Sequence, residues 1–296
     1  MAKKSAVIDL GSNSLRMGIF QLEDGKIVQT ERFREQVRIS EGLVLDNLLK
    51  EEPVKRTLSA LKKFKNILDE KGIVNIKMVA TEALRRAKNS SGFIAQVKSR
   101  FGIDVEIIDG LNEARYDVIA AKTSVSYKDF YMIDTGGGSV EIALVLDGEV
   151  KDACCLPLGS VVMTEKFKPD EFGAEQMEKF LQTEFFKTGI IKKNGLPVVA
   201  LGGSNKELAK ISLEFEREID GYKIKASDSK KIYESLKAQT LMERKEVKGL
   251  DPKRADTIIA GLWPMVSLVE LCGAEEISFC TGSVREGVAA EMLYEK

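Results

Sequence analysis

The chain has 296 residues, 44% of them hydrophobic and 31% charged, which is the composition of a globular protein with about two domains. Lys plus Arg number 45 and Asp plus Glu 46, so the net charge of −1 argues against bulk nucleic-acid binding. The sequence has no histidine, which excludes Ser-His-Asp triads, Cys-His pairs and histidine-ligated zinc. Acid–base chemistry must therefore come from carboxylates, lysine, tyrosine or cysteine.

The sequence predicts neither a secreted protein nor a membrane protein. The apolar patch within Met1–Asp9 is too short for a signal-peptide core. The longest uncharged run, Thr257–Val269, contains Pro264 and is too short to span a bilayer, so we expect a buried helix there. We expect a cytoplasmic protein whose cysteines are buried small hydrophobes without a redox or metal role. These cysteines are Cys154, Cys155, Cys272 and Cys280.

The chain opens with a strand, a tight turn and a second strand. We expect the strands at Ala6–Ile8 and Arg16–Leu22, with the turn at Asp9–Ser14. Asp24-Gly25 then predicts a hairpin turn into a strand over Lys26–Arg38. This antiparallel opening differs from a Rossmann domain, in which the first strand leads directly into a helix.

Helices and strands alternate after this opening. Pro53 and Gly72 suit the first turn and the end of an amphipathic helix. The next predicted elements are a strand at Ile76–Ala80, a helix capped by Thr81, a helix at Ser90–Arg100, a strand at Val105–Ile108 and a helix at Asn112–Ala121.

The opening pattern then recurs in the second half of the chain. Asp9-x-Gly11 and Asp134-x-Gly136 stand in the same strand–turn–strand context, which predicts two related domains and not a solenoid. The repeated elements are a strand at Tyr131–Ile133, a turn at Asp134–Ser139, a strand at Val140–Leu146, a hairpin turn at Asp147-Gly148 and a strand at Glu149–Leu156. The remaining predicted elements are helices at 174–188, Lys230–Leu236, Arg254–Cys272 and Val284–Glu295, and a strand at Pro197–Leu201 that ends in Gly202-Gly203-Ser204.

Three Gly- and Ser-rich turns follow apolar strands, at 9–14, 134–139 and 202–204. Glycines let backbone N–H groups approach an anion closely, and serine hydroxyls add donors. Asp9 and Asp134 stand at strand ends, where carboxylates commonly hold magnesium that in turn bridges phosphate oxygens. An ordinary hairpin would account for one such turn, but the three together favour a phosphate site.

This combination resembles the phosphate-site pattern of the actin, sugar-kinase and heat-shock-protein-70 superfamily. More narrowly, the chain resembles the exopolyphosphatase/guanosine pentaphosphate phosphatase (Ppx/GppA) family. The matching stretches follow one another over nearly the whole chain. They are Ile8–Arg16, Ala80–Arg85, Asp109-Gly110 with Glu113-Ala114-Arg115, Asp134–Glu141, Leu158–Val161, Gly202–Ser204, Arg254–Asp256 with Ala260-Gly261, and Val284–Gly287.

The resemblance implies an α/β fold of two ribonuclease-H-like, actin-like ATPase domains. Each would hold a mixed sheet flanked by helices, with the active site in the cleft between the domains. We expect residues 1–122 with 282–296 to form the N-terminal domain and residues 123–281 the second. The final helix would pack back on the N-terminal domain.

The resemblance also assigns roles to individual residues. Glu113 matches the family's general base, Glu141 the second essential carboxylate, and Arg85, with Arg16, a cation for the terminal phosphoryl group. The expected metal ligands for Mg²⁺ or Mn²⁺ are Asp9, Asp134 and Glu141. The expected phosphate-binding residues are Ser12, Asn13, Arg16, Gly136, Gly137, Gly138, Ser139, Gly202, Gly203 and Ser204.

The resemblance implies a phosphoanhydride hydrolase that releases the terminal phosphate of inorganic polyphosphate, of pppGpp, or of both. The partner would then be a small-molecule polyphosphate or guanosine penta- or tetraphosphate, without nucleic acid or membrane, and a homodimer is left open. A phosphotransferase of the same superfamily and a non-catalytic nucleotide or alarmone sensor are the alternatives. Two departures from the family pattern are Asn112, where many members have Glu, and Val162, where Arg is frequent.

Overall fold

The computed structural model describes residues 4–213 and 218–294. The chain forms two compact units: unit 1 comprises Met1–Tyr116 and Val284–Lys296, and unit 2 comprises Asp117–Ser283. The division into actin-like domains of residues 1–122 with 282–296 and of residues 123–281 stays a prediction. No helix in the described part of the chain is long and apolar enough to cross a membrane.

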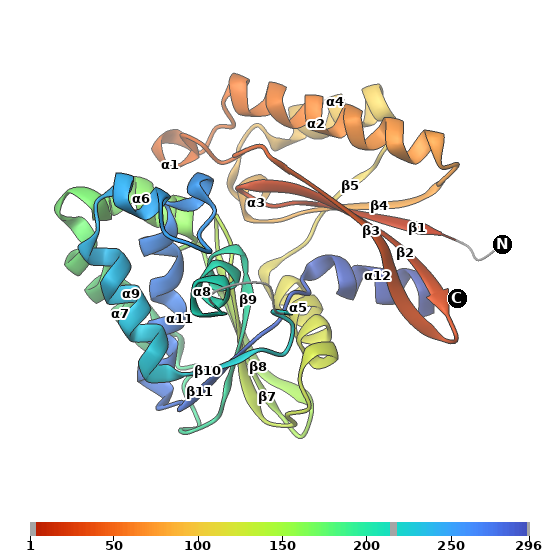
Figure 1. The fold of residues 1–296 in the computed structure, drawn as a ribbon. Helices are drawn as coiled ribbons and strands as arrows, with labels where there is room; N and C mark the ends of the chain where they lie inside the picture. The colour runs from red at the N-terminus through yellow and green to blue at the C-terminus, as the bar shows by residue number, and fades with distance from the viewer. Residues whose placement is uncertain (1–3, 214–217, 295–296) are drawn as a thin grey trace. The chain divides into compact units, whose positions relative to one another are not determined.

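The sheet of unit 1 is built from β1 (Ser5–Leu10), β2 (Ser14–Glu23), β3 (Lys26–Gln36), β4 (Asn75–Ala80) and β5 (Val105–Ile107). Its strand order is β3-β2-β1-β4-β5, as Figure 1 shows. The first three strands form an antiparallel meander, whereas β4 runs parallel to β1 and β5 parallel to β4. Asp24 and Gly25, with φ angles of 49° and 75°, form the predicted hairpin turn.

Helices cover both faces of the unit 1 sheet. They are α1 (Leu43–Asp46), α2 (Glu51–Glu70), α3 (Glu82–Arg86), α4 (Ser90–Phe101) and α12 (Val284–Tyr294), together with the first residues of α5 (Gly110–Ser124). Alternate side chains of β1 point to opposite faces. Ile8 therefore joins a core with Leu61 of α2, whereas Val7 joins a second core with Val288 of α12. The sheet is thus enclosed on both sides (Figure 1).

The sheet of unit 2 repeats this plan. Its strands are β6 (Phe130–Thr135), β7 (Val140–Leu146), β8 (Glu149–Leu156), β9 (Val198–Gly202), β10 (Lys223–Lys225) and β11 (Glu276–Phe279). The order is β10-β11-β9-β6-β7-β8, with an antiparallel meander from β6 to β8 and with β9 parallel to β6. Asp147 and Gly148 have φ angles of 55° and 76°, so this second hairpin turn is also the predicted one.

The helices of unit 2 pack around a central apolar helix, α11 (Ile258–Cys272). The other helical segments are α6 (Ser160–Phe167), a π-helical turn (Pro169–Gly173), α7 (Ala174–Thr188), α8 (Gly203–Leu213), α9 (Ala226–Ala238), α10 (Leu241–Lys245) and a 3-10 turn (Pro252–Arg254). Nearly all of α11 is buried, including Pro264, as expected for a helix that is hydrophobic all round. The uncharged run is therefore a core helix, as predicted.

Three details of the predicted elements need correction or lie outside the structure's description. The helix predicted over Arg254–Cys272 begins only at Ile258, because the 3-10 turn precedes it. Thr81 does precede α3, but its hydroxyl makes no capping hydrogen bond. Glu295, the predicted end of the last helix, lies outside the described residues.

Candidate active and phosphate-binding site

Three reactive side chains stand in one row across the sheet of unit 2. Asp134 on β6 pairs in register with Glu141 on β7, and Glu141 pairs with Cys155 on β8. Residues directly opposite in antiparallel strands project from the same face of the sheet. Glu141 is almost fully buried, with 1% of its surface exposed, and Asp134 is buried too. Two of the three predicted metal ligands are therefore neighbours on one sheet face.

The equivalent row in unit 1 carries different charges. Asp9 on β1 pairs in register with Arg16 on β2, and Arg16 pairs with Arg34 on β3. Arg16 Nη1 lies 4.0 Å from Asp9 Oδ2, and Arg34 Nε donates to Ser14 Oγ at 3.3 Å. The predicted repeat is thus present in the strand register. One copy presents an aspartate with arginines, and the other presents two carboxylates with a thiol.

The two glycine turns have the same closure. Gly11 N–H donates to Ser14 O at 3.1 Å, and Gly136 N–H donates to Ser139 O at 3.0 Å. Each turn joins the first two strands of its sheet, so the aspartate of the row stands two residues before the turn's first glycine, and Arg16 or Glu141 stands two residues after its serine. The aspartate, the turn and the next charged side chain are consequently fixed by one local unit.

The following loop supports the turn of unit 2. N–H groups of Gly159, Ser160 and Val161 donate to the carbonyl oxygens of Gly138, Gly136 and Gly137, respectively, at 2.9 to 3.0 Å. A Cβ on Gly159 would lie 2.5 Å from backbone atoms of the turn, so only glycine fits there. Val162, one of the departures from the family pattern, still donates its N–H to Gly137 O.

The turn of unit 1 is supported in the same way by the segment after β3. The N–H groups of Val37 and Arg38 donate to Asn13 O, and the N–H group and hydroxyl of Ser40 donate to Ser12 O. In both copies, the supporting bonds engage carbonyl oxygens of the turn. The carbonyl oxygens of each turn are therefore fixed by hydrogen bonds from the supporting segment. This arrangement suits a turn whose backbone N–H groups would bind an anion.

The third predicted phosphate turn, at residues 202–204, packs tightly against other parts of unit 2. A Cβ on Gly202, whose φ is 92°, would lie 2.5 Å from Asp134 Oδ1. A Cβ on Gly203 would overlap the guanidinium group of Arg254. Glu207, which is 3% exposed, lies 4.0 Å from Arg254 Nε. These glycines bring a buried arginine and a buried aspartate to one turn, so Arg254 is a candidate site residue to which the sequence motif assigns no role.

Glu113 and Arg85 form an ion pair within unit 1. Arg85 Nη1 lies 2.7 Å from Glu113 Oε2 and also donates to Ile108 O at 2.8 Å, while its Nε donates to Glu82 Oε2 at 3.0 Å. Glu113 is buried, with 8% of its surface exposed. The predicted general base and the predicted cation are therefore brought together, although they come from α5 and α3.

The start of α5 explains the Asn112 departure. Asp109 Oδ1 accepts the N–H of Asn112 at 2.8 Å, and Asp109 Oδ2 accepts its side-chain amide at 2.9 Å. An amide at this position can donate to the capping aspartate, which a carboxylate cannot do. Asn112 thus secures the first helical turn and, with it, the backbone of Glu113.

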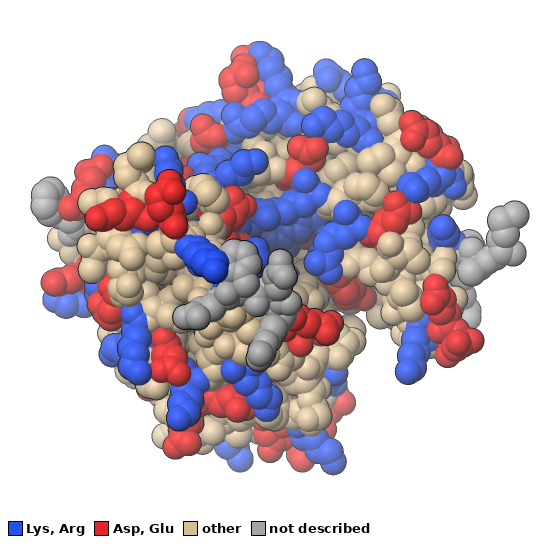
Figure 2. Space-filling model, in the orientation of Figure 1, with Lys and Arg blue, Asp and Glu red and all other residues tan. Residues whose placement is uncertain are grey.

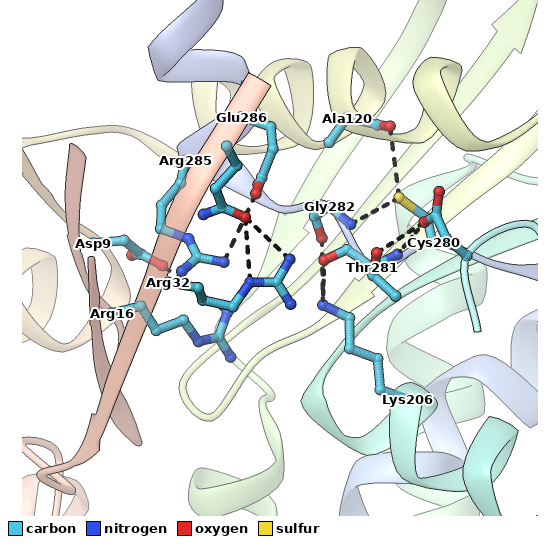
Figure 3. A network of polar contacts seen from close by, with 12 residues as sticks. Asp9, Arg16, Arg32, Ala120, Lys206, Cys280, Thr281, Gly282, Arg285 and Glu286 are labelled. Atoms are coloured by element: carbon cyan, nitrogen blue, oxygen red, sulfur yellow. Dashed lines mark hydrogen bonds and ion pairs between the residues drawn. The ribbon is translucent and has the colours of Figure 1, made fainter. Parts of the chain in front are cut away.

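Asp9 lies among several charged groups of unit 1. Burial raises the pKa of Asp9 above its usual value, Glu286 adds to the rise, and Arg16 and Arg285 oppose it. Burial also lowers the pKa of Arg285, which is 3% exposed. Figure 3 shows Arg16, Arg285 and Glu286 with Asp9. Burial therefore disfavours the charged form of Asp9, and positive charge nearby favours it.

The predicted metal ligands do not form a complete protein-made metal site. Among residues 4–213 and 218–294, no three acidic or cysteine side chains come together as a metal cluster. Asp134 and Glu141 nevertheless offer neighbouring oxygen ligands, and Asp9 offers one in the other unit. Mg²⁺ usually takes one or two carboxylates and completes its shell with water and phosphate oxygens. The donor set fits such a cation.

A surface groove of 880 Å³ lies elsewhere in unit 1, against α2 and α4. It is lined by described residues that include none of the predicted site residues. Its Lys55 pairs with Glu51 at 2.7 Å, and Lys65 pairs with Asp69. Figure 2 shows both basic and acidic side chains over the part of the molecule where Figure 1 draws α2. We therefore place the site at the glycine turns and not at this groove.

A family model described as the Ppx/GppA phosphatase family matches residues 18–296. The chain belongs to the Ppx/GppA phosphatase family. A solved Ppx/GppA family member from Aquifex aeolicus has 29% sequence identity and a TM-score of 0.84, with 100% of this chain and 99% of that chain covered. The predicted family and the predicted two-sheet, actin-like fold are thereby confirmed.

Two curated relatives of this Ppx/GppA chain are longer proteins. It is 29% identical over 309 residues to a bifunctional 3-dehydroquinate synthase/phosphatase of Fusobacterium nucleatum, covering 96% of this chain and 46% of the relative. It is 27% identical over 302 residues to a guanosine-5'-triphosphate,3'-diphosphate pyrophosphatase of Photobacterium profundum, covering 97% and 59%. The Ppx/GppA chain thus spans between 46% and 59% of the length of these two relatives.

One prediction about the cysteines is wrong. Cys272 and Cys280 are buried, but Cys154 and Cys155 are only half-buried. Cys155 Sγ donates a hydrogen bond to Glu141 Oε1 at 3.1 Å, so it is not a plain core hydrophobe. The sequence does contain a feature that predicts this contact. Counting outward from the Asp147-Gly148 turn along the two strands of the hairpin places Cys155 opposite Glu141.

Proposed function

We propose that this Ppx/GppA chain hydrolyses a terminal phosphoanhydride bond. The observation that carries the proposal is the ion pair of Glu113 with Arg85, because it orients a buried glutamate in a chain without histidine. Phosphoryl transfer to water needs an oriented water and charge neutralisation on the transferring group. Glu113 and Arg85 supply one group for each requirement.

Glu113 is the proposed general base. Its carboxylate can accept the proton of the attacking water while Arg85 and the first turn of α5 keep it in place. Arg85 has a planar guanidinium group with five N–H donors, so it can contact a phosphoryl oxygen while it holds Glu113. The same side chain would then orient the base and stabilise negative charge on the phosphoryl group.

The two glycine turns are the proposed phosphate cradles. The turn of unit 2 would offer the backbone N–H groups of Gly137, Gly138 and Ser139, and the turn of unit 1 those of Ser12 and Asn13. Arg16 stands at the register position next to Asp9, so unit 1 would add a guanidinium group to its turn. The proposal draws on residues of both units, since Glu113 belongs to unit 1 and Glu141 to unit 2.

A divalent cation is part of the proposal. Phosphatases of this family are generally metal-dependent. Asp134 and Glu141 would hold the ion, with Asp9 as the contribution of unit 1. When bound, Mg²⁺ or Mn²⁺ would neutralise charge on the phosphate oxygens. Asp134 and Glu141 themselves would contribute two buried carboxylates, which the pairing of β6 with β7 fixes next to the glycine turn.

The proposed substrates are linear phosphoanhydrides, namely pppGpp and inorganic polyphosphate. The name of the Photobacterium profundum relative favours pppGpp, and the family resemblance also includes exopolyphosphatases. Both substrates end in the same phosphoanhydride group, so the residues at the terminal phosphate would serve either one.

The test is phosphate release from pppGpp, polyphosphate and ATP with Mg²⁺, each measured with and without a sugar acceptor. We expect release from pppGpp, polyphosphate or both, independent of the acceptor. Transfer to the acceptor would instead identify a phosphotransferase. Tight binding of a guanosine polyphosphate without any turnover would identify a sensor. Either of these last results would overturn the proposed hydrolysis.

A further inference from the structure

Residues 36–40 occupy hydrogen-bond acceptors in the middle of the turn between β1 and β2. The backbone carbonyl oxygens of Ser12 and Asn13 accept N–H groups of this segment. The side-chain oxygen of Asn13, Oδ1, accepts a hydrogen bond from Gln36 Nε2 at 3.4 Å. Both oxygens of Asn13, in the backbone and in the side chain, are therefore engaged by one neighbouring segment.

The side-chain donors of the same two residues lack partners in the part of the chain that the structure describes. Ser12 is 2% exposed, and its buried hydroxyl has no hydrogen-bond partner there. Asn13 is 8% exposed, and its side chain makes one hydrogen bond there, the one from Gln36. Buried polar groups are nearly always hydrogen-bonded, because leaving them unpaired costs free energy. The turn thus holds a hydroxyl and an amide that an acceptor on a ligand would satisfy.

The orientation of the Asn13 amide decides what this side chain can bind. The oxygen of an amide accepts hydrogen bonds, its nitrogen carries two N–H donors, and the two atoms project in different directions from a planar group. Because Gln36 donates to Oδ1, the Nδ2 end of Asn13 is the end left for a ligand. If the amide were turned over, its oxygen would meet the oxygens of a phosphate, and two acceptors cannot form a hydrogen bond. The orientation in this structure is the one that binds an anion.

Strand pairing fixes the position of Gln36. It is the last residue of β3 and pairs in register with Ser14, the first residue of β2. Its backbone is therefore held by the β2–β3 hairpin, while its side chain reaches the turn residue that precedes Ser14. The donor to Asn13 thus comes from a strand of the sheet and not from the turn itself.

We propose that Gln36 is a positioning residue that holds the Asn13 amide with its N–H donors toward a phosphate group of the substrate. The proposal rests on the proposed function of this turn as a phosphate cradle. Gln36 itself does not touch the phosphate in this scheme. It acts through Asn13, because its hydrogen bond to Oδ1 makes the side chain at the turn a donor to anions.

The first test is a double-mutant cycle on phosphate release. Gln36→Met keeps the length of the side chain but removes the donor, so it should raise KM by about three- to tenfold with kcat nearly unchanged. Gln36→Glu offers Asn13 only an acceptor, so the amide turns over and KM should rise by about tenfold or more. In an Asn13→Ala background, Gln36→Met should change KM less than about twofold. Gln36→Glu should keep only the smaller effect of its added negative charge there.

Gln21 provides the matched control. It lies on β2 at the other end of the β2–β3 hairpin, where its amide donates to Glu23 Oε1. Gln21→Met and Gln21→Glu make the same chemical changes in the same sheet, away from the turn, and should leave KM and kcat near the wild-type values. Circular dichroism of each variant shows that the comparison is made between folded proteins.

The second test measures binding without turnover. Inorganic tripolyphosphate with Mg²⁺ is titrated by isothermal calorimetry into Glu113→Gln protein, in which hydrolysis is slow under the proposed function. We expect the Kd to rise in Gln36→Met and to rise further in Gln36→Glu, by the same factors as KM. Both increases should shrink when Asn13→Ala is added, because the amide through which Gln36 acts is then absent.

The outcomes separate this proposal from the proposed function. A wild-type protein that hydrolyses none of the substrates but binds tripolyphosphate with this coupling overturns the proposed hydrolysis and supports the role of Gln36. Effects of the Gln36 variants that are equal with and without Asn13 overturn the positioning role and leave hydrolysis in place. Gln36 variants with the KM and Kd of their parents overturn it too, as does a protein that binds no tripolyphosphate.

Discussion

Arg16 and Glu141 occupy the same position in two copies of one strand–turn–strand unit. Each pairs in register with the aspartate of the preceding strand, Asp9 for Arg16 and Asp134 for Glu141. The copies therefore share a backbone and differ in charge. One strand–turn–strand pattern can in this way present a cation in one unit and a carboxylate in the other, and the proposed function assigns these to the phosphate and to the metal ion, respectively.

Glu113→Gln should lower kcat by about a hundred- to ten-thousand-fold while KM changes little, because the amide keeps the size of the side chain but cannot accept a proton. Steady-state phosphate release from the better substrate measures this. Glu106→Gln is the matched control, since Glu106 lies on β5 with 55% of its side chain exposed. Near-normal turnover in folded Glu113→Gln would show that another group activates the water.

Removal of divalent cations should abolish turnover, and added Mg²⁺ or Mn²⁺ should restore it. The reason is that Asp134 and Glu141 are neighbouring carboxylates and a polyphosphate is itself strongly negative, so a cation is needed to bring them together. Phosphate release in excess EDTA, followed by titration with each cation, provides the measurement. Full activity in EDTA would contradict the proposed cation site.

The pKa of Asp9 predicts how cation dependence changes with pH. Because burial raises this pKa, protons compete with the cation at a higher pH than they would for an ordinary aspartate. The Mg²⁺ concentration needed for half-maximal activity should therefore increase as the pH falls, and the increase should begin at a higher pH than for an ordinary aspartate. In Asp9→Asn, Mg²⁺ should bind more weakly at neutral pH and depend less on pH. An identical pH dependence in both proteins would exclude Asp9 from cation binding.

The parts of the site that are local in sequence could be predicted. The Asp-x-Gly turns, the Asp-Gly hairpins and the resulting pairing of Asp134 with Glu141 all lie within short hairpins, where turn chemistry sets the register. The repeat could be recognised for the same reason. Strand alternation then identifies which side chains share a face.

The parts that depend on tertiary packing could not be predicted from spacing. The ion pair of Arg85 with Glu113 joins two helices that the sequence separates. Gly203 looked like a phosphate-binding glycine, but it also makes room for Arg254, which comes from a distant 3-10 turn. Cys155 was predicted to be a core residue because it stands in an apolar strand-like run, whereas its polar partner, Glu141, lies on the neighbouring strand. In each case the residue itself could be read from the sequence, but the residue that it contacts in the folded protein could not.

Gly159→Ala should both destabilise the protein and weaken substrate binding. The new Cβ would lie 2.5 Å from backbone atoms of Gly137 and Gly138, so the phosphate turn of unit 2 must move. Overpacking of this kind costs about 1–3 kcal/mol in the free energy of unfolding.

Gly92→Ala is the control, because its Cβ meets nothing within 4 Å and the residue lies in α4, where alanine should stabilise by about 0.5–1 kcal/mol. Denaturant unfolding measures the change in stability of each variant. The KM for phosphate release measures the effect of Gly159→Ala on substrate binding at the turn. Since the proposed general base, Glu113, belongs to unit 1, we expect the larger effect on KM. A Gly159→Ala protein with unchanged stability and KM would mean that the loop after β8 does not support the phosphate turn.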